Sequence, residues 1–352
     1  MTVAAAIRLT LGTLDLEVDL EVEAGEVVAL LGPNGAGKST VLNALSGLQP
    51  IDGGRIAIDR RVVDDPQTRV FLPPERRPVG VVFQDYLLFP HLSVLENVAF
   101  GPRSAGVGRV EARARAQALL DRVGVGEHAG QRPRQISGGQ AQRAALARAL
   151  ATEPRLLLLD EPLAALDAGT RTTVRRDLRR HLREFDGATV LVTHDALDAL
   201  ALADRVVILE HGRVTQAGPL AEVTSQPRSS YVAELIGVNL LRGTAAGTTV
   251  SIGDRGGVVE VADPADGEVL LLVQPNAVTL HHHRQSDTSA RNQWRETVTG
   301  FDLLGDRVRV RLEGDVPLVA EVTPAAVASM DLVEGMEVWA AVKATEVTTY
   351  PS

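Results

Sequence analysis

Several residue types are scarce in this chain of 352 residues, and each shortage narrows what the protein can be. Cysteine is absent, which excludes disulfides and thiolate metal sites. Aromatic residues make up only 3%, so a packed core must consist mainly of leucine, valine, alanine and isoleucine. No apolar run reaches the roughly 18–20 residues that a membrane span needs, and no secretory signal is recognisable. We therefore expect a cytoplasmic protein.

Lysine is the next shortage, because only Lys38 and Lys343 occur among the 36 basic residues. The net charge of −9 argues against a nucleic-acid binder of the basic-patch kind. This charge is unevenly placed: residues 1–239 hold 27 basic and 29 acidic side chains, a balance of −2, whereas residues 240–352 hold 9 and 16, a balance of −7. Together with the length, the difference predicts two domains of different construction.

The first part of the chain alternates strand-like and helix-like segments. Buried strands are predicted within residues 25–32, 77–85, 155–162, 188–195 and 204–212, and helices within residues 38–48, 111–123, 137–150 and 196–203. From about Gly237 the pattern changes to short alternating segments separated by glycine, proline and aspartate, which is typical of an all-β barrel or sandwich. We therefore predict an α/β domain with a mostly parallel sheet over residues 1–236, with a helical subdomain at about 86–155, and an all-β domain over residues 237–352.

The stretch GPNGAGKST fits the phosphate-loop pattern GxxxxGK[ST] and lies between a predicted strand and a predicted helix. Its glycines allow backbone amides to turn toward phosphate oxygens, and the helix start adds its positive end. Lys38 is expected to reach the β and γ phosphates, and the Ser39 hydroxyl to ligate Mg²⁺. The sequence thus predicts an ATP site formed by Gly32, Pro33, Asn34, Gly35, Ala36, Gly37, Lys38, Ser39 and Thr40.

Polar side chains follow two further predicted strands. Asp160 and Glu161 end the leucine-rich strand, at the edge where ligands bind in open α/β folds. Asp160 is expected to hold Mg²⁺, largely through water, and Glu161 to orient and deprotonate the attacking water. His194 ends another strand, where it can contact the γ phosphate. Structural roles, such as a helix N-cap for the acids, are the alternatives at these positions.

A second glycine-rich helix start, SGGQ, comes about a hundred residues after the first. Ser137, Gly138, Gly139 and Gln140 would present a nest of amides there, although a simple serine N-cap is the plainer interpretation. One sheet edge cannot easily place both helix starts on one phosphate group. A second copy of the chain can, which predicts a head-to-tail homodimer that ATP holds together and hydrolysis releases.

Taken together, these residues resemble the ATP-binding-cassette (ABC) family over about residues 5–235. The resemblance implies a P-loop NTPase fold with a helical subdomain, and an ATPase that dimerises around two ATP molecules and drives a membrane permease. It implies that Gln84 contacts Mg²⁺ and senses the permease, that residues 86–101 border the groove for the permease, and that Asp167 ends the loop AALD.

Two positions depart from the pattern of the family. Ile136 stands where leucine is usual, which is a mild change. No aromatic residue precedes Phe71, although the family often stacks one on adenine from the first strands. An apolar residue such as Leu11 is expected to take that place, with affinity resting largely on the phosphates.

The C-terminal part resembles the OB-like accessory barrel of importer ATPases, and more narrowly the molybdate-binding type at about residues 286–350. The resemblance implies that a tetrahedral oxyanion would meet Ser289, Arg291, Thr323, Lys343 and Thr345. Ala326 stands where a hydroxyl residue is often found, and the acidic balance of this domain disfavours an anion. Three interpretations therefore stay open: an oxyanion site, half of a site shared between chains, and a structural or dimerising barrel.

Three adjacent histidines, His281 to His283, lie in a polar segment of the same domain. Metal binding is one interpretation. Adjacent residues on an extended segment point to opposite faces, so we expect a solvated loop.

The function that these features predict is the ATPase subunit of an importer for molybdate, bound peripherally to the cytoplasmic face of the membrane. Its expected partners are integral-membrane permease subunits and, indirectly, an extracytoplasmic solute-binding protein. The alternatives are an importer for sulfate, tungstate or iron, a soluble ABC ATPase, and a cytoplasmic oxyanion sensor. A soluble ABC ATPase usually carries long coiled-coil insertions or two cassettes, which this sequence lacks, and an oxyanion sensor would leave the complete catalytic set unexplained.

Overall fold

The computed structural model describes residues 3–164, 166–253 and 256–352. The chain divides into two compact units, residues 1–221 and 222–352. This division lies before Gly237, where the sequence pattern changes, because the short helices α7 (Leu220–Ser225) and α8 (Ser230–Ile236) precede the first strand of the second unit. Each unit is described by itself below.

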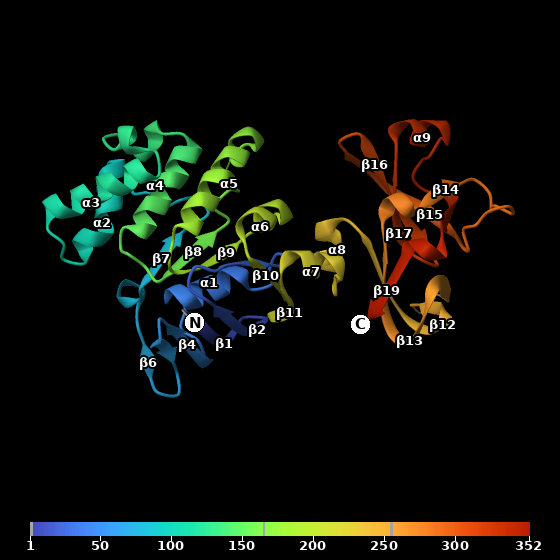
Figure 1. Ribbon diagram of the computed structural model, residues 1–352, viewed down its shortest axis with the longest axis horizontal. Helices are drawn as coiled ribbons and strands as arrows, with labels where there is room; N and C mark the ends of the chain where they lie inside the picture. Colours follow the sequence, from blue (N-terminus) through green and yellow to red (C-terminus); the bar gives the residue numbers. More distant parts are fainter. Residues whose placement is uncertain (1–2, 165, 254–255) are drawn as a thin grey trace. The chain divides into compact units, whose positions relative to one another are not determined.

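The first unit is built on one eleven-stranded sheet with a parallel and an antiparallel half (Figure 1). Its strand order is β6-β5-β4-β1-β2-β11-β10-β3-β9-β8-β7. The five strands from β10 to β7 run parallel: β3 (Val27–Leu31), β7 (Val79–Val82), β8 (Leu156–Asp160), β9 (Ala188–Val192) and β10 (Arg205–Glu210). Their near-continuous apolar sequence fits burial on both faces of a parallel sheet.

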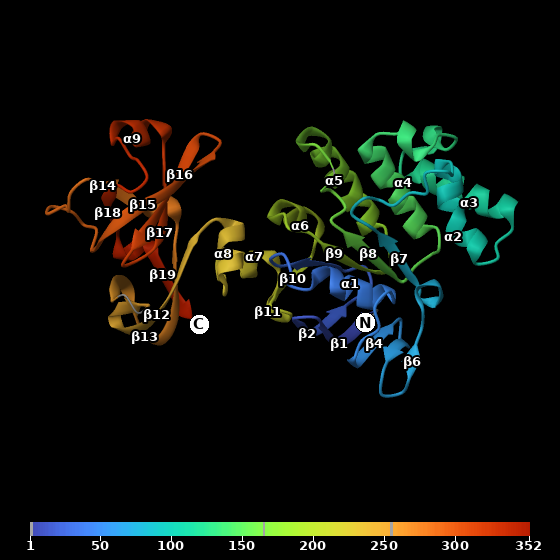
Figure 2. The same ribbon diagram turned by 180° about the vertical axis from the view of Figure 1, so that it is seen from behind.

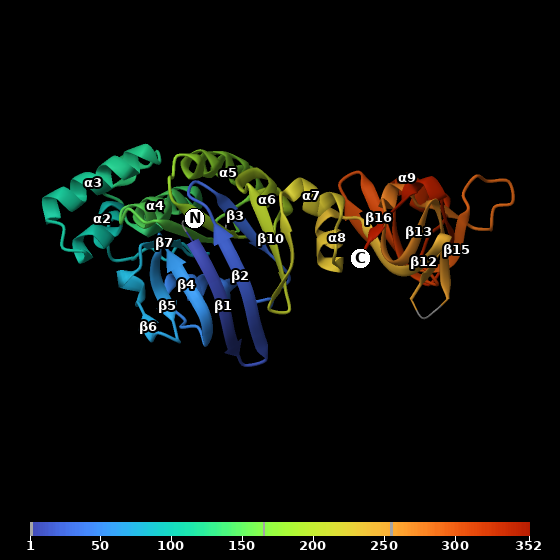
Figure 3. The same cartoon turned by 60° about the horizontal axis from the view of Figure 1, so that its bottom comes forward.

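The antiparallel half was not foreseen in the sequence. It consists of β1 (Val3–Leu11), β2 (Leu14–Val22), β4 (Gly53–Ile58), β5 (Arg61–Asp65), β6 (Val70–Phe71) and β11 (Arg213–Gly218), which pairs antiparallel with β10 and parallel with β2. Figure 3 shows β1, β2, β4, β5 and β6 gathered below the helices. In β1 and β2, buried residues alternate with more exposed ones, as expected for strands with one face on the core. The sheet is therefore mixed rather than mostly parallel.

Helices cover the parallel half of the sheet (Figures 1 and 2). They are α1 (Lys38–Ser46), α2 (Val94–Ser104), α3 (Arg109–Arg122), α4 (Gly138–Leu150), α5 (Ala168–Arg183) and α6 (Ala196–Leu202), with single 3₁₀ turns at Pro74–Arg76, Gly126–His128 and Pro133–Gln135. The helices α2, α3 and α4 share a small core of their own. On α3, three buried residues four positions apart, Ala112, Ala116 and Leu120, form the stripe that packs into it.

The second unit is an all-β domain of two sheets around one apolar core. One sheet holds β12 (Asn239–Ile252), β13 (Gly257–Val273) and β19 (Val347–Pro351). The other has the order β14-β18-β15-β16-β17, with β14 (Thr279–His281), β15 (Asn292–Leu304), β16 (Arg307–Gly314), β17 (Leu318–Val322) and β18 (Glu337–Val342). A short helix, α9 (Pro324–Ser329), and 3₁₀ turns at Pro275–Ala277 and Ala344–Glu346 complete it. The prediction of an α/β domain followed by an all-β domain is confirmed.

Among the described residues, no helix combines the length and the apolar character that a membrane crossing requires. The longest helix, α5, has 16 residues and is rich in arginine.

A buried arginine fixes the C-terminal end of α1, the helix that follows the phosphate loop. Arg77 donates to the carbonyl oxygens of Ala44 at 2.7 Å and Leu45 at 3.2 Å, and it pairs with Asp64 at 3.2 Å. Burial raises the pKa of Asp64 and lowers that of Arg77, while their ion pair opposes both shifts. The guanidinium thus satisfies helix-end carbonyls that water cannot reach.

We predict that Arg77→Met destabilises the first unit by about 3–5 kcal/mol, because the substitution leaves a buried carboxylate and two helix-end carbonyls without a partner. Denaturant unfolding followed by far-UV circular dichroism measures this, since most of the helices lie in that unit. Arg76→Met is the matched control, because the neighbouring side chain is exposed. Equal stability of the two variants would contradict the prediction.

The second unit holds a buried carboxyl group, Glu296, on β15. It is 1% exposed, and its Oε1 accepts a hydrogen bond from the Val316 amide at 3.0 Å. Burial raises its pKa to about 7, against the opposing effect of that hydrogen bond. Because the folded pKa lies above the unfolded value of about 4.5, this group favours folding below pH 4.5 and loses that contribution as the pH rises toward 7.

We therefore predict that the free energy of unfolding of the second unit falls between pH 4.5 and pH 7, by about 3 kcal/mol at most. Tryptophan fluorescence isolates this unit, because Trp294 and Trp339 are the two tryptophans of the chain. Glu296→Gln should flatten the pH dependence. The same slope in the variant as in the wild type would assign the effect to other groups.

Candidate functional site

The phosphate loop joins β3 to α1, and its shape depends on glycine at two points. At Gly32 a Cβ atom would lie 2.0 Å from the carbonyl oxygen of Leu209 on β10, so only glycine allows this approach of the two backbones. Gly37, the N-cap of α1, has φ 106°, in the left-handed region. A Cβ atom on Gly35 would have no other atom within 4 Å, and the φ of this residue is 79°. The loop therefore turns into the N-terminus of a helix with its Gly35 side open, an arrangement that suits a phosphate group.

The ammonium group of Lys38 lies inside this loop. Its Nζ donates to the carbonyl oxygens of Gly32 at 2.7 Å and Pro33 at 2.9 Å, and the residue is only 8% exposed. Burial lowers the pKa of Lys38, while the negative charges of Glu161 and Asp160 raise it. The charge of Lys38, after β3, therefore interacts with the charges of Asp160 and Glu161 at the end of β8, although the two segments are far apart in the sequence.

The register of the parallel strands brings the other predicted side chains to the same edge. Asp160 pairs with Val192 in β9, and the Glu161 amide donates to the carbonyl oxygen of Val192 at 2.9 Å. The Nδ1 atom of His194 lies 3.2 Å from Oε1 of Glu161. Leu159 pairs with Val82 in β7, and Gln84 follows two residues later in an exposed turn. The structure therefore places Asp160, Glu161, His194 and Gln84 along one edge, as the sequence predicted.

The two acids at this edge have different environments. Burial, and then the charge of Glu161, raise the pKa of Asp160, whereas Lys38 lowers it. A divalent cation would favour its ionised form, so Asp160 fits a metal-binding role, together with the exposed hydroxyl of Ser39. Glu161 has φ 44°, a left-handed conformation that is rare for a residue with a side chain, and its carboxylate faces His194. This arrangement suits a base that holds a water molecule.

The second glycine-rich helix start is the N-terminus of α4. Ser137 and Gln140 form a capping box: Gln140 Oε1 accepts from the Ser137 amide at 2.7 Å, and the Ser137 hydroxyl accepts from the Gln140 amide at 3.4 Å. The amides of Gly138 and Gly139 are left as first-turn donors of the helix. Ser137 and Gly138 are exposed, so this helix start can face a group outside the chain.

The surroundings of this helix start also explain its second glycine. A Cβ atom on Gly139 would lie 3.1 Å from Val174 and 3.3 Å from Thr170 of α5, so a larger residue would push α5 away. Asp167 is the N-cap of α5, and its carboxylate accepts from the Thr170 amide at 3.0 Å, which lowers its pKa. Within the predicted loop AALD, Ala165 lies outside the described residues. The helix start of α4 and the loop before α5 are therefore neighbours.

Sequence reasoning missed the ion-pair network behind this edge. Arg171 and Arg175 of α5 reach the buried carboxylate of Asp198 on α6, at 2.5 Å and 2.6 Å, and Arg171 also reaches Asp195 at 3.0 Å. Asp195 directly follows His194. The network therefore ties the segment that carries the histidine to the helix that begins at Asp167. No local pattern could reveal it, because its partners lie more than twenty residues apart.

The expected contact for adenine lies at the tip of the β1–β2 hairpin. Leu11 is 49% exposed and pairs with Leu14 across the turn. A Cβ atom on Gly37 would lie 3.3 Å from the Leu14 side chain and 2.7 Å from Leu16, so the first residues of β2 line the phosphate loop. The exposed side chain of Leu11 therefore lies on the hairpin that lines the phosphate loop, where no aromatic residue is available to stack on adenine.

The five residues predicted to meet an oxyanion do not form one site within one chain. Arg291 and Lys343 flank the paired residues Asn292 and Val342, and Ser289 and Thr345 are close to them along the chain. Thr323 follows Val322, which pairs with Val308, which in turn pairs with Leu303 near the far end of β15. Fully extended, the part of β15 between these two ends would span up to about 36 Å, so the two groups lie toward opposite ends of the strand. The hydroxyl of Thr323 also caps α9, because it accepts a hydrogen bond from the Ala326 amide.

Thr345 lines a hollow of about 480 Å³ in which Asp263, Asp266 and Glu268 also take part. Three carboxylates make this hollow unsuitable for an anion. The histidines lie elsewhere: His281 ends β14, and His282 and His283 are exposed in the segment that follows. Among the described residues, no group of three or more histidine, aspartate or glutamate side chains could hold a metal ion.

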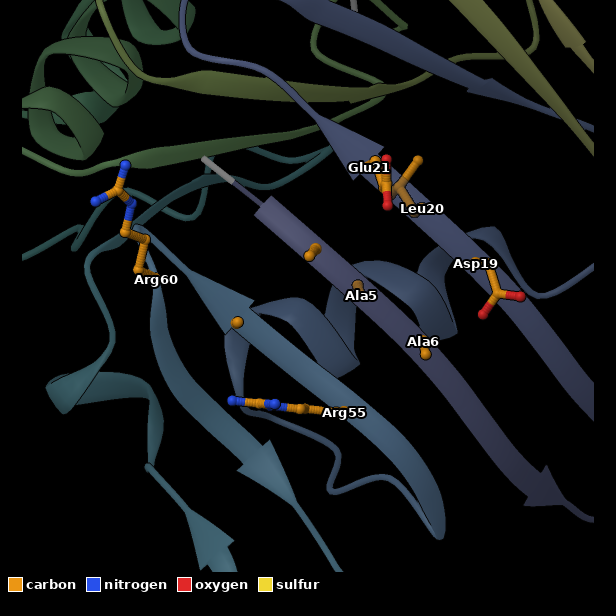
Figure 4. A pocket seen from close by; sticks show the side chains of 9 residues that line it. Ala5, Ala6, Asp19, Leu20, Glu21, Arg55 and Arg60 are labelled. Carbon is orange, nitrogen blue, oxygen red and sulfur yellow. The ribbon is translucent and has the colours of Figure 1, made fainter. Parts of the chain in front are cut away.

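A larger hollow, of about 630 Å³, lies on the outer face of the antiparallel strands rather than at the nucleotide edge. Figure 4 shows its alanine floor on β1, with Arg55 and Arg60 on one side and Asp19 and Glu21 on the other. Small side chains and walls of mixed charge give it no convergent set of donors or acceptors. Size alone does not identify the functional site here.

Comparisons with known proteins identify the family of the chain. The sequence profile of the ABC transporter family matches residues 16–164, and that of the TOBE domain matches residues 288–349. The chain is 43% identical over 350 residues to the molybdenum import ATP-binding protein ModC of Mycobacterium tuberculosis H37Rv, covering 96% of this chain and 94% of that protein. It is 40% identical over 319 residues to the sulfate/thiosulfate import ATP-binding protein CysA 1 of Chromobacterium violaceum, with 87% of each chain covered.

A third relative is the molybdate/tungstate import ATP-binding protein WtpC of Pyrococcus horikoshii, 35% identical over 337 residues with 95% of each chain covered. Two solved structures share the fold. One is the dimeric, post-hydrolysis state of an ATP-binding cassette bound to ADP and Pi, at 32% identity and a TM-score of 0.52, covering 62% of this chain and 99% of that one. The other is cbiO1 of Clostridium perfringens, part of an ABC transporter complex, at 29% identity and a TM-score of 0.56, covering 64% and 91%. The chain therefore belongs to the ABC transporter family, among the ATP-binding import subunits that carry a C-terminal TOBE domain.

Proposed function

We propose that this chain is the ATP-hydrolysing subunit of an importer that carries molybdate across the cell membrane. The observation that carries the ATPase part is the meeting of Lys38, Asp160, Glu161 and His194 at one edge of the parallel sheet. The molybdate part rests on the two relatives that are named for molybdenum and molybdate import and on the TOBE domain. The relative named for sulfate and thiosulfate import makes sulfate the second candidate solute.

In this proposal each residue at the edge has one task in phosphoryl transfer. The loop from Gly32 to Thr40 cradles the phosphates, and Lys38 exchanges its bonds to the Gly32 and Pro33 carbonyls for bonds to the β and γ phosphates. Ser39, Asp160 and Gln84 would hold Mg²⁺, which supplies charge neutralisation when bound. Glu161 orients a water molecule and accepts its proton, and His194 holds the water or the γ phosphate in place.

The exposed start of α4 supports a second proposal, that each ATP is completed by the Ser137 helix start of another copy. Its first-turn amides and the helix dipole would meet the γ phosphate from the side opposite Lys38. The dimeric cassette among the solved relatives supports this pairing. Loss of the γ phosphate then removes the contact that holds the copies together.

The partners would be permease subunits in the membrane, contacted by residues 86–101 of this chain at the cytoplasmic face, and an extracytoplasmic solute-binding protein that delivers the solute. The surface of that segment fits a protein contact, because Leu87 and Phe100 are 55% and 46% exposed. In the TOBE domain, the separation of Thr323 from Arg291 and Lys343 favours an oxyanion site that two copies would share.

Glu161→Gln should lower the rate of ATP hydrolysis by about 100-fold or more, because the amide cannot accept the proton of the attacking water. Phosphate release under saturating ATP measures this. Glu153→Gln is the matched control, since that carboxylate is 82% exposed and precedes β8 at its opposite end. Hydrolysis at the wild-type rate in Glu161→Gln would remove the base from the proposal.

Ser137→Arg should leave ATP binding to a single chain within about twofold of the wild type and abolish ATP-driven association, because the larger cation obstructs the helix start without touching Lys38. Fluorescent-nucleotide titration and sedimentation velocity measure the two effects separately. Lys38→Ala should instead abolish ATP binding to the single chain, and with it the association that ATP drives. If Ser137→Arg weakened binding to the single chain, the helix start would belong to the site of its own chain.

Calorimetric titration of the full chain with molybdate, tungstate, sulfate and phosphate tests the proposal for the TOBE domain. We expect molybdate and tungstate to bind, and Lys343→Met to abolish the binding. Lys38→Met is the matched control, because it removes the other lysine of the chain and any anion bound at the phosphate loop. Binding that follows Lys38 rather than Lys343, or no binding, would reduce the domain to a structural element.

A further inference from the structure

A half-buried arginine on α4, Arg148, holds the turn that follows Gln84. Arg148 donates from Nη1 to the carbonyl oxygen of Leu87 at 2.6 Å and from Nη2 to that of Tyr86 at 2.8 Å. Its guanidinium also lies 5.5 Å from the ring centre of Phe89. Burial lowers its pKa, and no carboxylate contributes to that pKa within the described residues. The arginine is thus used for its fork of donors rather than for an ion pair.

The turn that it holds is strained. Tyr86 and Leu87 have φ 59° and 42°, a left-handed conformation in two consecutive residues that are neither glycine nor asparagine. Tyr86 is 7% exposed, and its hydroxyl has no hydrogen-bond partner in the part of the chain described. The conformation therefore costs free energy locally. The two charge-assisted hydrogen bonds from Arg148 oppose this cost, together with the burial of Tyr86.

The far end of the same segment is anchored separately. Asn97 of α2, which is fully buried, accepts from the Phe89 amide at 2.7 Å and donates to the carbonyl oxygens of Phe89 at 3.1 Å and Ser93 at 2.9 Å. Between Gln84 and Phe89, the backbone anchor from another helix is Arg148. This helix, α4, begins with the exposed Ser137 capping box three turns earlier.

We propose that Arg148 is a positioning residue that couples two parts of the nucleotide site. It fixes the turn that carries Gln84 to the helix that carries Ser137, so that the proposed Mg²⁺ contact and the proposed contact with the other copy's γ phosphate move as one body. The inference rests on the proposed function for its consequence in catalysis. The clamp itself, a forked contact between α4 and a strained turn, stands independently of that function.

Hydrogen exchange tests the clamp without any enzymatic readout. In the folded chain the Tyr86 amide donates to the Phe83 carbonyl at 2.9 Å, and the Leu87 amide to that of Asp85 at 2.6 Å. Arg148→Met should speed exchange across residues 84–88 at least tenfold and leave residues 141–147 of α4 unchanged. Arg143→Met on the same helix is the control, because its contact is a 3.5 Å approach to Gly124 instead. Unchanged exchange at residues 84–88 would overturn the clamp.

A double-mutant comparison tests the catalytic consequence. Arg148→Met and Gln84→Ala should each lower kcat about tenfold or more and raise the Mg²⁺ concentration for half-maximal rate, with ATP affinity of the single chain within twofold. The double variant should be no more than about twofold slower than the slower single variant, because both changes act through Gln84. Multiplied effects, or a loss of ATP affinity in step with kcat, would overturn the coupling.

Arg148→Lys covers the case in which Arg148→Met fails to fold. It keeps the charge but reaches only one carbonyl at a time, so we expect an intermediate exchange rate at residues 84–88 and an intermediate kcat. Wild-type behaviour in Arg148→Lys would contradict the role of the fork. If the wild type itself hydrolysed no ATP, the proposed function would fail, whereas the exchange experiment would still decide on the clamp.

Discussion

The buried ammonium of Lys38 beside two carboxylates is the interaction on which the site depends. It exists because β3 and β8 run parallel with β9 between them, so that the phosphate loop and the Asp160–Glu161 pair leave the sheet at the same edge. Gly32 allows the close approach to β10 that fixes the start of the loop. The charges suit the proposed polyphosphate site. Lys38 would bind the phosphates, Asp160, whose pKa is raised, would share a metal ion, and Glu161, held against His194, would act as the base. The rest of the first unit keeps these strand ends in register.

This edge of the sheet supplies only one half of the proposed ATP site, and the start of α4 in another copy would supply the other half. The start of α4 is capped internally by Ser137 and Gln140, and its exposed first residues leave backbone amides that can donate to an anion from outside the chain, as the proposed dimer requires. Arginines connect the helices around it to segments at the edge of the sheet. Arg171 and Arg175 tie the histidine segment to α5, and Arg148 ties the turn after Gln84 to α4. Each arginine links a segment at the proposed nucleotide edge to α4 or α5, whose starts are neighbours. In the proposed dimer a change at the γ phosphate would therefore move helices rather than single side chains.

The sequence predicted the parts of this site that depend on local patterns. Three features of the site are recognisable from stretches of about ten residues each: the phosphate loop, the acids after β8 and the capped helix start. The parallel strands were recognisable as apolar runs. The antiparallel half of the sheet was not predicted, because strands that alternate buried and exposed residues give a weaker pattern than the continuous apolar runs of the parallel strands. Arg148 and Asp198 could not be singled out, since their roles arise from register between distant segments and this chain has more than thirty arginines. The oxyanion residues show the opposite limit: a resemblance gathered Thr323 and Lys343 into one group, and strand pairing places them at opposite ends of β15.

In the proposed dimer, one ATP is bound by Lys38 of one copy and by the Ser137 helix start of another. Mixing two variants tests it most directly, Lys38→Ala and Ser137→Arg, both in a Glu161→Gln background so that bound ATP persists. Neither variant alone can build a complete site, whereas a mixed pair holds one intact site, with Lys38 from one chain and Ser137 from the other. Sedimentation velocity with one variant fluorescently labelled measures their association. The account predicts ATP-dependent dimers in the mixture and monomers in each variant alone; monomers in the mixture, or dimers of either variant alone, would contradict it.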